Sequence, residues 1–147
     1  MRRTGLYIAF AGLIAAAVVL LAPAPASAQQ AQFDIIIVRA TNDGDSMDPA
    51  LNKYAHLLRG KGYTNFTKSG GTSFSLAKGG TRTISIAGSL KAEFTYQSEV
   101  NNRVAFQCRI LKGNKEQLKI NYSVPRRGKT VVVVSGTVAY MLVIEVR

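Results

Sequence analysis

Cysteine, histidine and tryptophan are nearly or wholly missing from this 147-residue chain, which has one cysteine, one histidine and no tryptophan. The single cysteine, Cys108, cannot form a disulfide bond within the chain, so stability must come from packing. The single histidine, His56, has no second imidazole with which to build a zinc site, and no nucleophile–base pair surrounds it in the sequence. These absences exclude a disulfide scaffold and a multi-histidine metal centre, and they predict a protein that is not an enzyme.

Acidic residues are also few, with 8 Asp and Glu against 19 Lys and Arg and a formal net charge of +11. Four of the acidic residues lie early, between positions 29 and 48, where the only basic residue is Arg39. The rest of the chain is strongly basic. Such a charge attracts anionic partners, and it also keeps a protein soluble.

The first 28 residues have the pattern of an export signal. Arg2 and Arg3 form a positive start, residues 6–22 are uninterruptedly apolar, and Ala26-Ser27-Ala28 offers the small side chains that a signal peptidase requires. We predict Sec-type export with cleavage after Ala28, to the periplasm or beyond, and an uncleaved anchor is the alternative. Cleavage removes two basic residues and no acidic ones, which leaves a single domain, 29–147, of 119 residues with a net charge of +9.

The apolar pattern of this domain is mainly that of β-strands. Residues 33–38 are β-branched and apolar on both faces, as in a strand that is covered on each side. Asp48 followed by Pro49 is typical of a helix start, and Gly60 ends a predicted helix of about three turns. Further strands are expected over residues 63–67, 73–77, 81–87, 90–97, 103–111, 116–124, 130–135 and 137–146.

This order of elements predicts an antiparallel β-sandwich or a partly open barrel of about 7–8 strands, with one short α-helix after the first strand. Within the strand predicted over residues 103–111, Cys108 alternates with apolar residues on one face. We therefore expect its thiol to be buried and inert.

Oxygen-bearing side chains are concentrated on the loop that precedes the helix, where Asn42, Asp43, Asp45 and Asp48 offer the ligands that calcium prefers. The spacing lacks the glycine and the bidentate glutamate of an EF-hand, because the chain continues into Pro49 and the helix. Helix capping and turn formation explain the same residues. Calcium bound by Asp43, Asp45 and Asp48 is therefore a hypothesis, and no other cofactor is expected.

Basic residues recur on the polar faces of three successive predicted strands and in the turn that follows them. If the strands are neighbours in a meander, these side chains form a patch that suits phosphate or sulfate groups. No aromatic side chain interleaves with them, which argues against a site for nucleic acid, and a solvated face explains the same charges. The residues predicted for this anion-binding patch are Lys91, Arg109, Lys119, Arg126, Arg127 and Lys129.

Taken along the chain, a signal is followed by a strand that leads into Ala40-Thr41-Asn42-Asp43, then by Asp48-Pro49, by Leu76-Ala77-Lys78-Gly79 and by an apolar C-terminal strand. In this order the sequence resembles small secreted bacterial β-sandwich-like proteins of unknown function. The resemblance covers most of the predicted domain and implies a β fold and export. It implies no particular site residue.

Three classes of function stay open. The first is an exported, non-enzymatic binding or structural module of the bacterial envelope or extracellular space. Its partner would be an anionic polymer, such as lipopolysaccharide, a wall polymer, an acidic polysaccharide or extracellular DNA, or else an unknown protein. The second is a calcium-assisted recognition module, and the third is an enzyme whose site is assembled from distant residues. An uncovered strand edge would favour assembly with other chains.

Overall fold

The computed structural model describes residues 29–136 and 138–147. The predicted export signal, residues 1–28, lies outside the described residues. In the part of the chain that the structure describes, no helix is both long enough and apolar enough to cross a membrane.

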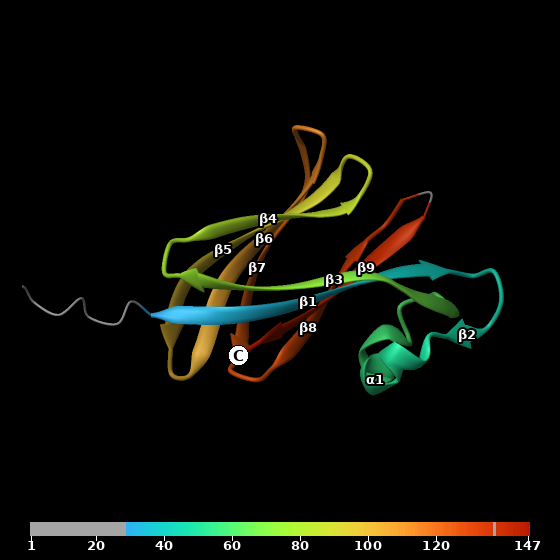
Figure 1. The fold of residues 1–147 in the computed structure, drawn as a ribbon, viewed down its shortest axis with the longest axis horizontal. Coiled ribbons are helices and arrows are strands. Elements are labelled where there is room, and N and C mark those ends of the chain that lie inside the picture. The colour runs from blue at the N-terminus through green and yellow to red at the C-terminus, as the bar shows by residue number, and fades with distance from the viewer. Residues whose placement is uncertain (1–28, 137) are drawn as a thin grey trace, which may run out of the picture.

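Two sheets pack face to face, and a short helical segment lies on the outer side of one of them (Figure 1). The five-stranded sheet has the order β2-β3-β1-β9-β8, and the four-stranded sheet is the meander β4-β5-β6-β7. The predicted mainly-β sandwich with one short helix is confirmed. The elements are β1 (Gln30–Thr41), β2 (Ser46–Met47), the 3-10 helix η1 (Pro49–Tyr54), α1 (Ala55–Leu58), β3 (Asn65–Ala77), β4 (Thr81–Ala87), β5 (Leu90–Val100), β6 (Arg103–Lys112), β7 (Lys115–Pro125), β8 (Lys129–Val134) and β9 (Ala139–Val146).

Strand β3 differs from the prediction, because the two short strands expected at 63–67 and 73–77 are one continuous strand. The Ser-Gly-Gly stretch at 69–71 does not turn the chain. It lies where the antiparallel register between β1 and β3 shifts, opposite Ile37 and Val38. Pairing with the long strand β1 therefore converts an expected turn into a β-bulge. The two-residue strand β2, which pairs in parallel with the start of β3, was also not predicted.

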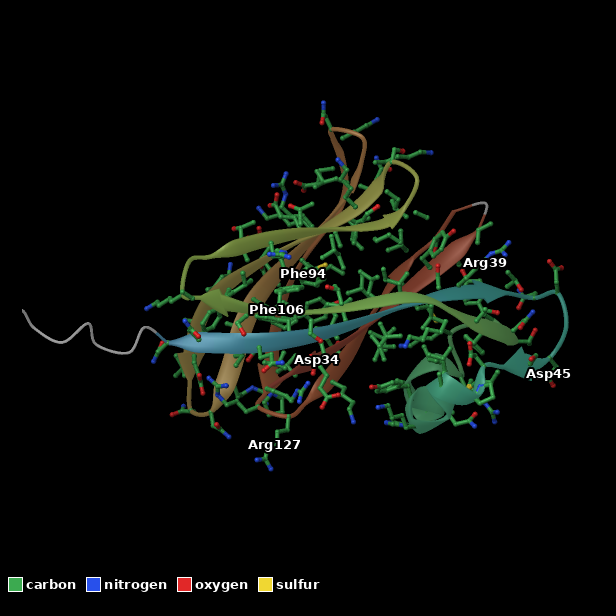
Figure 2. The ribbon with its side chains drawn as sticks, viewed as in Figure 1. Asp34, Arg39, Asp45, Phe94, Phe106 and Arg127 are labelled. Carbon is green, nitrogen blue, oxygen red and sulfur yellow. The ribbon has the colours of Figure 1, made fainter. Side chains whose placement is uncertain are left out.

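The main core lies between the two sheets, and aromatic rings fill its centre. Phe33 on β1 is fully buried, and its ring centroid lies 5.2 Å from that of Phe106 and 5.6 Å from that of Phe74. Phe94 and Phe106, labelled in Figure 2, lie on neighbouring strands of the four-stranded sheet. The inward-facing residues of both sheets thus meet around one phenylalanine.

A second core lies on the outer face of the five-stranded sheet, under the helical segment. Leu51, Tyr54 and Leu58 are buried there against Val38, Met141 and other apolar residues of β1, β3 and β9. Leu51 and Tyr54 are three residues apart, which matches the turn of the 3-10 helix η1, whereas Tyr54 and Leu58 are four apart and are joined by α1. Strand β1 is therefore covered on both faces, as its β-branched sequence predicts.

Cys108 on β6 faces the main core, where it is 1% exposed, and burial raises the pKa of its thiol to about 12. Its predicted burial is confirmed. Because the thiolate is the reactive form, we expect no labelling of the native protein by a disulfide reagent at about pH 8, and labelling of one thiol after unfolding. Absorbance of the released thiol measures this. Rapid labelling of the native protein would contradict the buried position.

Candidate functional site

The acidic loop lies between β1 and β2, at the end of the five-stranded sheet, where Figure 2 labels Asp45. Asp43 and Asp45 are exposed. The loop is attached to the start of β3, because Thr64 Oγ1 donates a 2.6 Å hydrogen bond to the Gly44 carbonyl and Asn65 Nδ2 donates a 3.0 Å bond to the Asp43 carbonyl. Gly44 has φ +102°, a conformation that favours glycine. The loop is thus built by contacts of its backbone.

Asp48, the third predicted calcium ligand, is occupied by the protein itself. It is the N-cap of η1, where its Oδ1 accepts a 3.0 Å bond from the Ala50 amide, while its Oδ2 accepts a 3.3 Å bond from the Lys68 amide on β3. Within residues 29–136 and 138–147, no three His, Cys, Asp or Glu side chains form a group that could hold a metal ion. The structure therefore does not bring Asp43, Asp45 and Asp48 together as one set of ligands.

Replacing Asp48 by alanine should lower the free energy of unfolding by about 1–2 kcal/mol, because the variant loses the helix cap and the tie to β3. Denaturant unfolding followed by circular dichroism measures the loss. Asp45→Ala is the matched control, since it removes an exposed carboxylate of the same loop and should change stability by less than about 0.5 kcal/mol. Equal effects of the two substitutions would contradict the cap.

Calcium itself is tested by thermal unfolding with and without the ion. A calcium ligand on this loop would raise the melting temperature of the wild-type protein, and Asp45→Ala would abolish the rise. Absence of any shift at millimolar calcium would remove the hypothesis.

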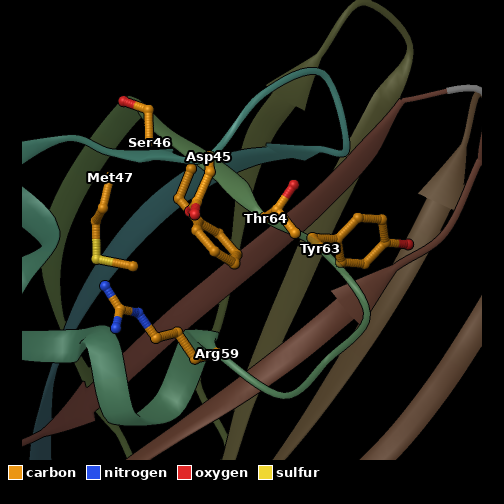
Figure 3. Close-up of a pocket in the computed structure, with 7 residues that line it drawn as sticks. Asp45, Ser46, Met47, Arg59, Tyr63 and Thr64 are labelled. Carbon is orange, nitrogen blue, oxygen red and sulfur yellow. The ribbon is translucent and has the colours of Figure 1, made fainter.

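A pocket of about 330 Å³ opens beside the acidic loop (Figure 3). Met47 and Phe66 give it apolar walls, and Asp45, Arg59 and Tyr63 add a carboxylate, a guanidinium and a phenol. The side chains of Asp45 and Arg59 do not form an ion pair. Arg59, directly after α1, and Asp45, on the acidic loop, therefore line the same pocket.

Lys91, Arg109 and Lys119 lie on the outer face of the four-stranded sheet, on neighbouring strands as predicted. Arg109 stands opposite Glu93 on β5 and forms two ion pairs of 2.9 Å, with Glu93 and with Glu116. Hydrogen bonds to Glu116 and Glu93 raise the pKa of Arg109 above its ordinary value. These five charges sum to only +1, so much of the predicted attraction for anions is neutralised on this face.

Arg126 and Arg127 lie at the opposite end of the four-stranded sheet, because the turn after β7 lies beside the start of β6, where Pro125 pairs with Arg103. Arg126 binds Glu99 through two hydrogen bonds, of 2.8 and 2.5 Å, and these lower the pKa of Glu99. Arg127 is exposed, and its side chain points away from the sheets in Figure 2. The six predicted residues therefore do not form one patch.

Lys129, at the start of β8, lies instead near the helical segment. Its Nζ is 5.6 Å from the centre of the Tyr54 ring, and the Nζ of Lys53 is 5.0 Å from the same ring. Arg59 and Lys61 follow on the exposed side of this segment, whose residues 49–62 contain no Asp or Glu. We call Lys53, Arg59, Lys61 and Lys129 the basic ridge.

The basic ridge was not predicted from the sequence, except for Lys129. The available signal was the absence of acidic residues from 49–62, together with basic residues at positions that do not face the core. His56 is exposed on the same segment. The ridge residues form no ion pairs within the described chain, in contrast to Arg109 and Arg126.

Comparisons with protein-family models, with curated proteins and with solved structures find no match to this chain. The resemblance to small secreted bacterial β proteins stays a prediction.

Proposed function

We propose that the protein is an exported, non-enzymatic binding module that engages an anionic polymer of the envelope or extracellular space through the basic ridge. The observation that carries the proposal is the convergence of Lys53 and Lys129 on the ring of Tyr54, without a carboxylate partner in the described residues. These two lysines come from distant parts of the chain and are brought together by the fold.

The spacing of the two ammonium groups suits an anionic chain. They lie no more than about 11 Å apart, because their distances to one ring centre are 5.0 and 5.6 Å. Charges this close are separated by about one Debye length at physiological salt, so both act on a single anionic segment. The ring also supplies a π-face on which an ammonium group is stabilised.

In the sheet register, the acidic residue closest to the two lysines is Glu145 on β9, which lies directly opposite Lys129 on β8. Lys129 forms no ion pair with it and lies over Tyr54 instead. The ridge therefore keeps its cations available to a ligand. On the four-stranded sheet, by contrast, an anion would have to displace Glu93 and Glu116 from Arg109.

The non-enzymatic part of the proposal rests on the sequence, where a single histidine and the lack of a nucleophile–base pair argue against catalysis. Export rests on the pattern of residues 1–28. Carboxylated and sulfated polymers both suit the basic ridge, so the test includes one of each.

The test is retention of the domain on immobilised polygalacturonate, heparin and neutral dextran. We expect binding to the two polyanions at about 50 mM salt, elution as salt rises, and no retention on dextran, because binding releases counterions from the polymer. The logarithm of the binding constant should fall linearly with the logarithm of salt concentration. Failure to bind any polyanion at low salt would contradict the proposal.

A further inference from the structure

Strand β8 forms an edge of the five-stranded sheet and has no neighbour on its outer side among the described residues. Its sequence is Lys129 followed by one threonine and four valines, so residues 130–134 carry no charge. Val131, Val133 and Val134 are partly exposed. An uncharged, β-branched edge strand with free backbone groups is a template for pairing with another strand.

The other edges of the sandwich carry features that hinder such pairing. Strand β7 includes Lys115, Glu116 and Lys119, its register with β6 shifts, and it ends at Pro125. Strand β4 includes Arg82, and its register with β5 also shifts. Strand β3 is bulged and is partly covered by β2. Strand β8 pairs with β9 without a register shift, and after Lys129 it contains neither a charged residue nor a proline.

We propose that β8 is a dimerisation edge, at which it pairs antiparallel with β8 of a second copy of this chain. The five strands of each copy then form one continuous sheet. The pairing centres on Val132, so that Thr130 faces Val134 of the other copy and each valine meets an uncharged residue. Such a symmetric contact uses the same surface on both copies.

Charge determines the direction of pairing and favours a self-complementary contact. In antiparallel pairing, the two Lys129 residues lie at opposite ends of the interface, whereas parallel pairing would place them side by side. In this pairing, the core-facing sides of the two joined five-stranded sheets lie on one face of the continuous sheet. The helical segments of both copies lie on the other face. The two basic ridges of a dimer therefore point in the same direction.

The salt dependence distinguishes this contact from polymer binding. Each predicted mature domain carries a net charge of +9 and repels its copy, while the paired residues 130–134 carry no charge. Added salt screens the repulsion, so dimerisation should strengthen as salt rises, while binding to a polyanion should weaken. Five residues from each copy form a small interface, so we expect a weak dimer that appears only as protein concentration rises.

The test is light scattering with size-exclusion chromatography across protein concentration, at about 50 and 500 mM sodium chloride. We expect a monomer–dimer equilibrium that shifts toward dimer at high salt and is abolished by Val133→Lys. The matched control is Thr83→Lys, which adds the same charge to the exposed edge strand β4 and should dimerise as the wild-type protein does. Dimerisation of Val133→Lys would overturn the assignment to β8.

A second measurement protects the test against misfolding of Val133→Lys. Amide hydrogen exchange of the wild-type protein should slow within residues 129–134 as its concentration rises, and other edges should not change. A wild-type protein that stays monomeric, with no change in exchange on β8, would overturn the proposal. Polymer binding by the monomer would leave the proposed function standing.

Discussion

Replacing Phe33 by alanine should lower the free energy of unfolding by about 3–5 kcal/mol. The ring is fully buried at the centre of the main core. It contacts four other rings, with centroid distances of 5.2 Å to Phe106, 5.6 Å to Phe74, and 6.5 Å to both Phe94 and Tyr96. Its removal leaves a cavity between the two sheets that the rigid strands cannot close.

Val100→Ala is the control for this experiment, because Val100 is 63% exposed at the end of β5. It removes apolar surface outside the core and should change stability by less than about 0.5 kcal/mol. Denaturant unfolding of both variants, followed by circular dichroism and by tyrosine fluorescence, measures the difference. A loss below about 1 kcal/mol for Phe33→Ala would contradict the central position of this ring.

The double substitution Lys53→Gln with Lys129→Gln should weaken binding to polygalacturonate or heparin about 30-fold. Each lysine near an anionic surface contributes about 1 kcal/mol, so loss of both corresponds to about 2 kcal/mol. The salt dependence should become shallower, because fewer counterions are released. Both side chains are exposed apart from their contacts with Tyr54, so the fold should be retained.

The matched control is Lys91→Gln with Lys119→Gln, which removes the same charge from the four-stranded sheet. Binding of this variant should fall by less than about threefold, because these lysines act at a distance that salt screens. Isothermal titration at one salt concentration compares the variants. Equal losses from the two pairs would mean that net charge, rather than the basic ridge, determines binding.

Most strands could be predicted because their sequences contain both the apolar alternation and the turn residues. The range predicted for β4 agrees with the structure, and the predicted ranges of β5 to β9 differ from the observed strands by no more than three residues at either end. Alternation predicted the inward face of β7, where Val124 is buried and Lys119 is exposed. These are local properties, and each strand carries them in its own residues.

Strand β3 and the helical segment show where local patterns fail. The glycines at 70 and 71 are typical of a turn, but β1 pairs with them along a bulge, and that contact lies more than thirty residues away in the sequence. The helix start at Asp48 and Pro49 was predicted correctly. Its first turns are of the 3-10 type, because Leu51 and Tyr54 reach the sheet at a spacing of three residues.

The candidate site was harder to predict than the fold, because charges are neutralised by residues that are distant in the sequence. Lys91, Arg109 and Lys119 were placed on the correct face, but the sequence does not show that Glu93 and Glu116 both bind Arg109. Nor does it show that Arg126 reaches Glu99. A count of basic residues therefore indicates an anionic partner without indicating where it binds.

The convergence of Lys53 and Lys129 on Tyr54 likewise depends on tertiary structure, since the helical segment and β8 are brought together only by the second core. Here the sequence offered a partial signal, the lack of carboxylates over residues 49–62. That signal predicts an uncompensated charge. It does not predict that β8 would place Lys129 beside Lys53 on the Tyr54 ring.

The most direct test of the basic ridge is a nuclear magnetic resonance titration of the isotope-labelled domain with a short oligogalacturonate at low salt. We expect the amide and lysine side-chain signals to shift for residues 53–61 and 127–131, while those of Lys91 and Lys119 stay nearly unchanged. Shifts centred on the outer face of the four-stranded sheet, or spread evenly over all basic residues, would contradict the account.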